Sequence, residues 1–230
     1  MMIWRRFPME FYEYLPFWSK LTEEQQQLLS RNVTLHQVSK GEIVHNGSED
    51  CIGPLIVVHG QLRGYSFSED GREVTLYRLF ERDVCILSAY CMLNSLQFDI
   101  SVQAEKDTSF YVIPAPIYKK LMQESAPVAN YTTELIATRF SDVMWLLDQI
   151  LYKHLDSRLA AFLVNESELN DTLSLQLTHE KIAHHLGSAR EVVTRMLKYF
   201  QTEKMVEISR GCITITDLDK LTEIAKDSLR

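Results

Sequence analysis

The chain has 230 residues and a formal net charge of −7 at pH 7, with 46% hydrophobic and 24% charged residues. This length suffices for one large or two modest packed domains, and the composition excludes a disordered chain. The acidic balance also argues against a protein that coats nucleic acid without regard to sequence.

The sequence predicts a cytoplasmic protein with no membrane partner. Its apolar runs, such as those at 55–58 and 144–147, are far shorter than the roughly 20 residues of a membrane helix. The first nine residues show no apolar core followed by a cleavage site. The four cysteines form no CxxC pair, so reduced thiols are expected.

The first half of the chain reads as a short helical lead-in followed by strands. In residues 10–30, Thr22 is the expected N-cap of EEQQQLL, with a glutamate at the capping-box position. From about 33 to 114, short alternating runs are separated by turn signals, and the Asp70-Gly71 pair predicts a hairpin. VQAEKDTSFYVI adds a further pair of strands. The many short strands predict a β-sandwich or a barrel-like roll.

A long helix is expected next. Pro114 and Pro116 close the strand-rich region, IYKKLMQE predicts a short helix, and after Pro127 a helical pattern extends to about Leu155. Within it, apolar residues recur in alternating steps of four and three, the period of a coiled-coil seam. We interpret this seam as a homodimer interface, with an ordinary buried helix as the alternative. Its residues are Ile136, Phe140, Val143, Leu147 and Ile150.

The remaining residues predict a compact mixed domain. LDSRLAAFLVNESEL is an expected helix and LSLQL a short strand. THEKIAHHLG and SAREVVTRMLKYFQTEK are two helices hinged at Gly187. MVEIS and CITI are strands around Arg210-Gly211, and DLDKLTEIAKDSL is a final helix.

The two helices hinged at Gly187 meet several independent requirements of a helix-turn-helix. With His179 as the first position, Ala183 is the fifth, where the helices cross closely, and Gly187 is the ninth, where the turn favours a positive φ. Thr178 precedes the first helix as its N-cap. Apolar residues occupy the inward positions, namely Ile182, Leu186, Val193 and Met196.

The second helix of such a unit enters the major groove of double-stranded DNA. Arginine can form two bonds to guanine, and glutamate can accept a bond from cytosine. A plain helical hairpin with a solvated face is the alternative, but VEISRGCITI reads as a wing that carries Arg210 in its turn. Residues 178–211 also hold six Lys/Arg against four Glu. The outward polar residues of the second helix are Ser188, Arg190, Glu191, Thr194 and Arg195.

The stretch from Leu177 to Asp217 resembles the winged helix-turn-helix of the CRP/FNR family, and the similarity extends along nearly the whole chain. KGEIVHNGSED and PLIVVHGQLRGYSFSEDGREVTLYRL look like that family's N-terminal β-roll, and the helix at 127–155 stands where the family keeps its dimerisation helix. The resemblance implies an α+β fold with a double-stranded, jelly-roll-like β-roll sensor (1–125), a dimerisation helix (126–155) and a winged helix-turn-helix (156–230). It also implies a transcription regulator, not an enzyme, that works with RNA polymerase.

The resemblance further assigns a recognition trio. Arg190, Glu191 and Arg195 match the R-E-x-x-x-R pattern that reads a half-site, and members with this trio favour TGTGA-like half-sites in a palindrome. Thr194 fills the position from which some members make a further base contact. The full expected DNA-binding set is Thr178, His179, Ser188, Arg190, Glu191, Thr194, Arg195, Lys198 and Arg210.

The sensor part departs from family members that bind cyclic nucleotides. Those carry a Gly-Glu pair and, a dozen or so residues later, an Arg-Ser pair, because arginine neutralises the cyclic phosphate and glutamate bonds the ribose. Here Ile86 and Leu87 stand at the first pair, and Gln97-Phe98 or Phe98-Asp99 at the second. No basic residue lies between Val84 and Phe98. Cyclic AMP is therefore not the expected effector, and no cofactor is assigned.

The candidate effector region consists of Cys85, Leu87, Cys91 and Phe98. Cys85 and Cys91 are either a redox- or metal-sensing pair or two buried, inert thiols. Iron–sulfur sensors of the family use an N-terminal cysteine cluster, whereas residues 1–50 contain no cysteine. Haem ligation would have to use a lone histidine, and lone histidines are more often structural; the candidates are His36, His45, His59 and His154.

Two other classes of protein compete with the DNA-binding interpretation. β-rolls of this kind resemble cupins, but the strand-rich region has no His-x-His pair for a facial metal site, and no local motif suggests a nucleophilic triad. A signalling module that acts on a partner protein is the stronger alternative. The wing and the recognition trio argue against it.

Overall fold

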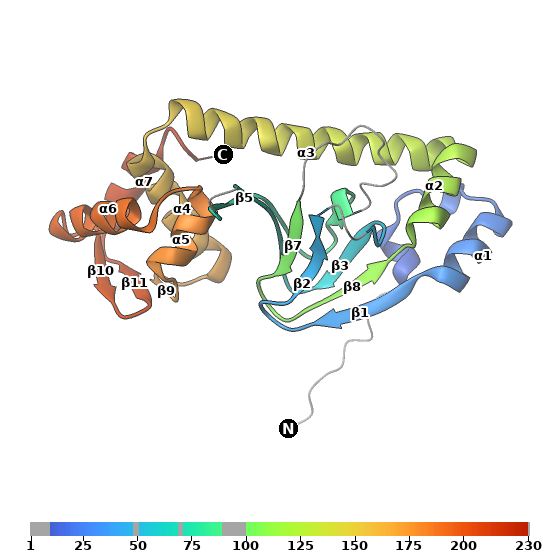
Figure 1. Ribbon diagram of the computed structural model, residues 1–230, viewed down its shortest axis with the longest axis horizontal. Helices are drawn as coiled ribbons and strands as arrows, with labels where there is room; N and C mark the ends of the chain where they lie inside the picture. Colours follow the sequence, from blue (N-terminus) through green and yellow to red (C-terminus); the bar gives the residue numbers. More distant parts are fainter. Residues whose placement is uncertain (1–9, 48–50, 69–70, 89–99, 230) are drawn as a thin grey trace, which may run out of the picture. The chain divides into compact units, whose positions relative to one another are not determined.

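The computed structural model describes residues 10–47, 51–68, 71–88 and 100–229 (Figure 1). The fold is α+β, and the chain divides into two compact units. The first comprises residues 1–66 and 76–142, and the second comprises residues 67–75 and 143–230. Among the described residues, none of the helices has the length and apolar character that a membrane crossing requires.

The first unit begins with short 3₁₀ turns, η1 (Phe11–Tyr14) and η2 (Trp18–Lys20), and helix α1 (Glu23–Asn32). Thr22 caps α1, as predicted, and the reciprocal partner of the capping box is Gln25. The expectation of a glutamate there is wrong, because the third residue after Thr22 is a glutamine whose Oε1 accepts from the backbone N–H of Thr22 at 3.1 Å.

Two four-stranded antiparallel sheets form the β-roll. Their orders are β1-β8-β3-β6 and β2-β7-β4-β5. Because the alternating apolar side chains of both sheets meet inside the roll, Leu55, Leu62, Leu79 and Val102 are fully buried. The strands are β1 (Thr34–Val38), β2 (Ile43–Asn46), β3 (Leu55–His59), β4 (Leu62–Phe67), β5 (Glu73–Leu79), β6 (Val84–Cys85), β7 (Ser101–Ala104) and β8 (Thr108–Val112).

The strands predicted in VQAEKDTSFYVI exist as β7 and β8, but they do not pair with each other. β7 lies between β2 and β4, and β8 lies between β1 and β3. The short link at Glu105–Asp107 therefore crosses from one sheet to the other. The Glu105 carboxylate there accepts from Gln61 at 2.7 Å and pairs with Arg78 at 3.0 Å, which anchors the corner.

The helices after the roll are α2 (Ala115–Glu124) and α3 (Ala126–Tyr152), and α3 is drawn as one unbroken helix in Figure 1. Four of the predicted seam residues are at least 36% exposed in the single chain, and Phe140 reaches 66%. Val143 is half-buried. A long helix that exposes this many large apolar side chains is left without a cover by the part of the chain that the structure describes.

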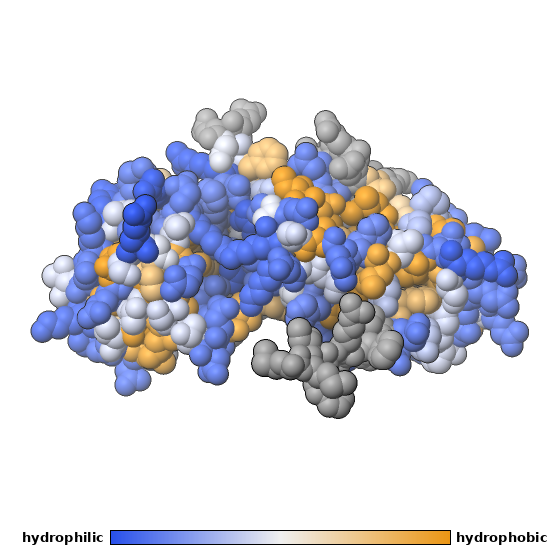
Figure 2. Space-filling view, turned by 90° about the horizontal axis from the view of Figure 1, so that it is seen from below, coloured by the Kyte–Doolittle hydropathy of each residue, from blue (hydrophilic) through white to orange (hydrophobic). Residues whose placement is uncertain are grey.

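The second unit contains helices packed against a small sheet of order β10-β11-β9. Its core is a separate cluster around Leu159, Leu163, Leu197, Phe200 and Leu221. The face of this unit shown in Figure 2 is predominantly hydrophilic. Its elements are α4 (Leu155–Asn170), β9 (Ser174–Leu175), α5 (His179–Leu186), α6 (Arg190–Thr202), β10 (Val206–Ser209), β11 (Cys212–Ile215) and α7 (Leu218–Ala225).

Candidate nucleic-acid interface

Helices α5 and α6 form the predicted helix-turn-helix. The Thr178 hydroxyl caps α5 by accepting from the backbone N–H of Lys181 at 3.1 Å. Gly187 ends α5 in the left-handed conformation with φ +62°, and the N–H of Ser188 then donates to the Ala183 carbonyl. The turn therefore uses the residue type that such a φ favours. α6 begins at Arg190, so Ser188 precedes the second helix and does not lie on it as expected.

The apolar spacing places the predicted inward residues in the core. Ile182 and Val193 are fully buried, Leu186 is 7% exposed, and Met196 packs against the same cluster. Ala183 is also buried at the helix crossing. α6 is therefore held along its inner face by packing, and its outer face is free for polar residues.

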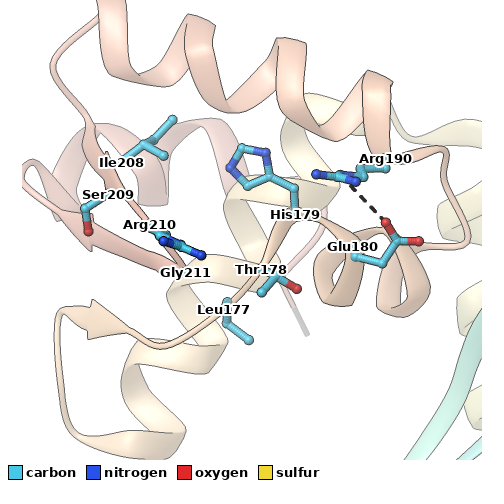
Figure 3. Close-up of a pocket in the computed structure, with 9 residues that line it drawn as sticks. All are labelled: Leu177, Thr178, His179, Glu180, Arg190, Ile208, Ser209, Arg210 and Gly211. Carbon is cyan, nitrogen blue, oxygen red and sulfur yellow. Dashed lines mark ion pairs between the residues drawn. The ribbon is translucent and has the colours of Figure 1, made fainter.

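The outer face of α6 carries residues that the sequence predicts to contact DNA. Arg190, Glu191, Arg195 and Lys198 are all exposed. Nε of Arg190 lies 3.7 Å from the Glu180 carboxylate on α5 (Figure 3). Exposed ion pairs of this kind contribute little to stability, so Arg190 can exchange this partner for another acceptor at small cost.

A groove of about 540 Å³ separates the start of α5 and Arg190 from the turn of the wing. It is lined by 177–180, Arg190 and 208–211, and Figure 3 shows these residues around the opening. The structure thus brings Thr178, His179, Arg190 and Arg210 to one place. The N-terminus of a helix, with two arginines beside it, suits a phosphate or another anionic group.

His179 connects the two helices. Its Nδ1 lies 2.9 Å from the Thr194 hydroxyl, which also bonds the Arg190 carbonyl at 2.8 Å. Partial burial lowers the pKa of His179, and the nearby charges of Arg190 and Lys198 lower it further. The ring is therefore neutral near pH 7.

The wing consists of β10 and β11, joined at Arg210-Gly211, and Arg210 is exposed. Beside the turn, Cys212 is a free thiol whose sulfur lies 3.2 Å from the Ser174 hydroxyl and 3.3 Å from the Gln176 amide nitrogen. The hydrogen bond to Ser174 is the largest cause of a lowered pKa of this thiol.

Residues 67–75 group with the second unit, which sequence reasoning did not anticipate. Thr75 Oγ1 lies 2.9 Å from Nδ1 of His185, and the carboxylate of Glu73 lies 3.5 Å from His184. Val74 faces Gly187 so closely that a Cβ on the glycine would lie 3.0 Å from it. These partners are more than 100 residues apart in sequence, so no local pattern could indicate them.

The candidate effector region is described only in part. Cys85 is a free, buried thiol 3.6 Å from the Tyr77 hydroxyl, and Leu87 is buried, whereas Cys91 and Phe98 lie outside the described residues. The guanidinium of Arg139 on α3 stacks 5.0 Å from the Tyr77 ring centroid. Arg139 therefore brings a basic group to this place from a distant part of the sequence, which the absence of basic residues in 84–98 did not indicate.

One cysteine departs from the prediction made from the sequence, whereas the histidines that the structure describes here have structural contacts or are buried. Cys51 is disulfide-bonded, so the prediction of four reduced thiols is wrong for this residue. His36 stacks on Phe110 and bonds Thr34, and His45 is buried. Within the described ranges, no three His, Cys, Asp or Glu side chains are grouped so as to hold a metal ion.

The β-roll, the long helix and the winged helix-turn-helix together define a DNA-binding protein of the regulator type. A Crp-like helix-turn-helix domain matches residues 157–224. A crystal structure assigned to the CRP/FNR family of transcriptional regulators, from Eubacterium rectale ATCC 33656, is 55% identical over 93% of this chain and 99% of that chain, with a TM-score of 0.92. This chain belongs to the CRP/FNR family of transcription regulators.

More distant relatives cover most of the chain. The global nitrogen regulator of Synechococcus elongatus is 24% identical over 79% of this chain and 85% of that protein. The cyclic AMP receptor protein of Thermus thermophilus is 24% identical over 74% of this chain and 78% of that protein. The signals in their names differ, so family membership by itself does not identify an effector.

Proposed function

We propose that this regulator is a homodimer whose α6 helices read the two halves of a palindromic DNA site. The observation that carries the proposal is the exposure of Arg190, Glu191 and Arg195 on a helix whose opposite side is anchored by Val193 and Leu197, both fully buried. A helix held so firmly can present base-reading groups in a fixed geometry.

Each exposed side chain has a matching role. Arg195 forks to O6 and N7 of a guanine, and Glu191 accepts from the exocyclic amine of a cytosine. Arg210 and Lys198 neutralise phosphates, and the start of α5 at Thr178 and His179 supplies N–H groups to the same strand. The similarity of the trio to R-E-x-x-x-R favours a TGTGA-like half-site.

We assign three functional segments: a sensor at 1–125, a dimer helix at 126–155 and a reader at 156–230. The exposed apolar residues of α3 support an interface with a second copy, which would place the two readers about 34 Å apart, one turn of DNA. The setting is the cytoplasm, with RNA polymerase as the protein partner.

The effector is a small molecule or signal other than a cyclic nucleotide. The support is chemical, since 84–98 lack both the arginine and the Gly-Glu pair that such ligands require. The region around Cys85 and Leu87 is the proposed receiving part of the sensor. Binding of the effector there would shift the dimer between two states that differ in how the two α6 helices are oriented toward DNA.

Fluorescence anisotropy tests the proposed reader directly. The probe is a duplex with two inverted TGTGA half-sites whose centres lie about 10 base pairs apart, compared with a scrambled duplex. Wild type should bind the palindrome about a thousandfold or more tightly than the scrambled duplex. Arg195→Ala should lose about 1–3 kcal/mol per half-site, and Arg195→Lys nearly as much, because a point charge cannot form two parallel bonds.

The wing provides a contrasting variant. Arg210→Ala should weaken binding to both duplexes alike and reduce the slope of log K against log salt by about one, as expected for a lost phosphate contact. Lys120→Ala, an exposed cation on α2, is the matched control and should change neither quantity. Equal affinity of wild type for both duplexes, or undiminished discrimination by Arg195→Ala, would overturn the assignment of α6.

A further inference from the structure

Thr194 lies one turn after Glu191 and directly before Arg195, on a half-buried position of α6. Its hydroxyl is bonded twice within the protein, to the Arg190 carbonyl at 2.8 Å and to Nδ1 of His179 at 2.9 Å. A hydroxyl has a single proton to donate and two lone pairs. Where that proton goes decides what Thr194 can offer to DNA.

Both tautomers of His179 lead to the same result. If Nδ1 carries the proton, the ring donates to Thr194, and the hydroxyl donates to the Arg190 carbonyl. If Nδ1 is bare, the hydroxyl donates to the ring instead. In each case the only proton of the hydroxyl is used inside the protein.

The bond from His179 distinguishes Thr194 from ordinary helical threonines. Thr133, Thr138 and Thr222 also bond the carbonyl four residues earlier, at 3.0, 2.9 and 2.8 Å. That single bond is common in helices and weak enough to be exchanged. At Thr194 a side chain from the other helix adds a second bond, which fixes the rotamer.

The base edges in the major groove that a threonine hydroxyl would donate to are N7 and O6 of guanine, N7 of adenine and O4 of thymine. With its proton committed, Thr194 has no donor for them. What the side chain can still offer is a lone pair of the hydroxyl, which would accept from the amine of adenine or cytosine, and its methyl, which suits the C5 methyl of thymine. We infer that Thr194 determines specificity by reading a thymine in each half-site through a methyl contact, and that His179 is the positioning residue that holds it so.

This inference rests on the proposed function, and its test separates the two. Each thymine of the half-sites is replaced in turn by deoxyuridine, which removes only the methyl group. For wild type, one replacement should weaken binding roughly fourfold per half-site, the effect of losing one buried carbon group. Thr194→Val, which keeps the methyl, should retain both the affinity and this penalty. Thr194→Ser, which keeps the hydroxyl and loses the methyl, should bind the thymine-containing and the deoxyuridine-containing palindromes with equal affinity.

His179 is tested by the same ratio of affinities, which a loss of folding alone would not change. His179→Ala should reduce the thymine-to-uracil discrimination, and His179→Asn, which keeps a donor near Nδ1, should restore it. If Thr194→Ser keeps the penalty, another side chain contacts the thymine methyl, and if Thr194→Val loses affinity, the hydroxyl is the reader. Either result shows the inference to be wrong, although α6 still reads DNA. If wild type does not prefer the palindrome at all, the inference and the proposed function both fall.

Discussion

Gly187 shows how one residue serves two requirements of the turn. Its φ of +62° lies where a side chain is strained, and a Cβ would also approach Val74 at 3.0 Å. Gly187→Ala should therefore lower the free energy of unfolding by about 1 kcal/mol from backbone strain, plus a further amount for displacing Val74. Urea unfolding followed by circular dichroism measures this loss.

Gly211 offers a matched control in the same unit. Its φ is +73°, but no atom lies within 4 Å of where a Cβ would be. Gly211→Ala should show only the backbone cost. Should the two variants lose equal stability, Val74 does not press on the turn and the grouping of 67–75 with the helix-turn-helix is in doubt.

Individual residues differed in how well they could be predicted. Gly187, Thr178 and the inward residues of the helix-turn-helix were predictable because their roles depend on neighbours within one or two turns. The His179–Thr194 bond was not, although both residues were in the expected DNA-binding set, because it depends on how two helices cross. The position of Arg139 beside Tyr77 was not predictable either, because it depends on how α3 packs against β5.

The single elements were predicted better than their pairing. Alternation and turn residues indicated the strands of the roll, but period-two patterns do not specify which strand lies alongside. β7 and β8 therefore appeared as a pair, whereas each joins a different sheet. Likewise the sequence predicted that the second helix begins at Ser188. In the structure, Ser188 and Ala189 connect the turn to α6, which begins at Arg190.

Helix α3 carries the prediction about assembly. Phe140, 66% exposed in the single chain, should be buried against a second copy. Phe140→Asp would place a charge in that contact, and an unpaired buried charge costs several kcal/mol, so the variant should sediment as a monomer. Ser141→Asp adds the same charge to an exposed neighbour off the seam and should leave the dimer intact. A wild type that is monomeric at micromolar concentration, or a dimeric Phe140→Asp, would show the seam to be misassigned.

For the regulator as a whole, we predict that its sensor does not respond to cyclic nucleotides. Titration calorimetry with cyclic AMP, and with cyclic GMP as a second probe, should give weak or no binding, because no arginine lies between Val84 and Phe98. Arg139 is paired with Asp142 at 2.9 Å and stacked on Tyr77, so it is not free to replace that arginine. Saturable heat with a dissociation constant in the low micromolar range would contradict this.

DNA recognition is tested most directly by selection from a pool of randomised duplexes. Wild type should enrich one palindrome with two half-sites a helical turn apart. Arg195→Ala should enrich no single sequence while still binding the pool in a salt-dependent way, because its phosphate contacts remain. If wild type and Arg195→Ala enrich the same palindrome equally well, α6 does not read the bases of this regulator's site.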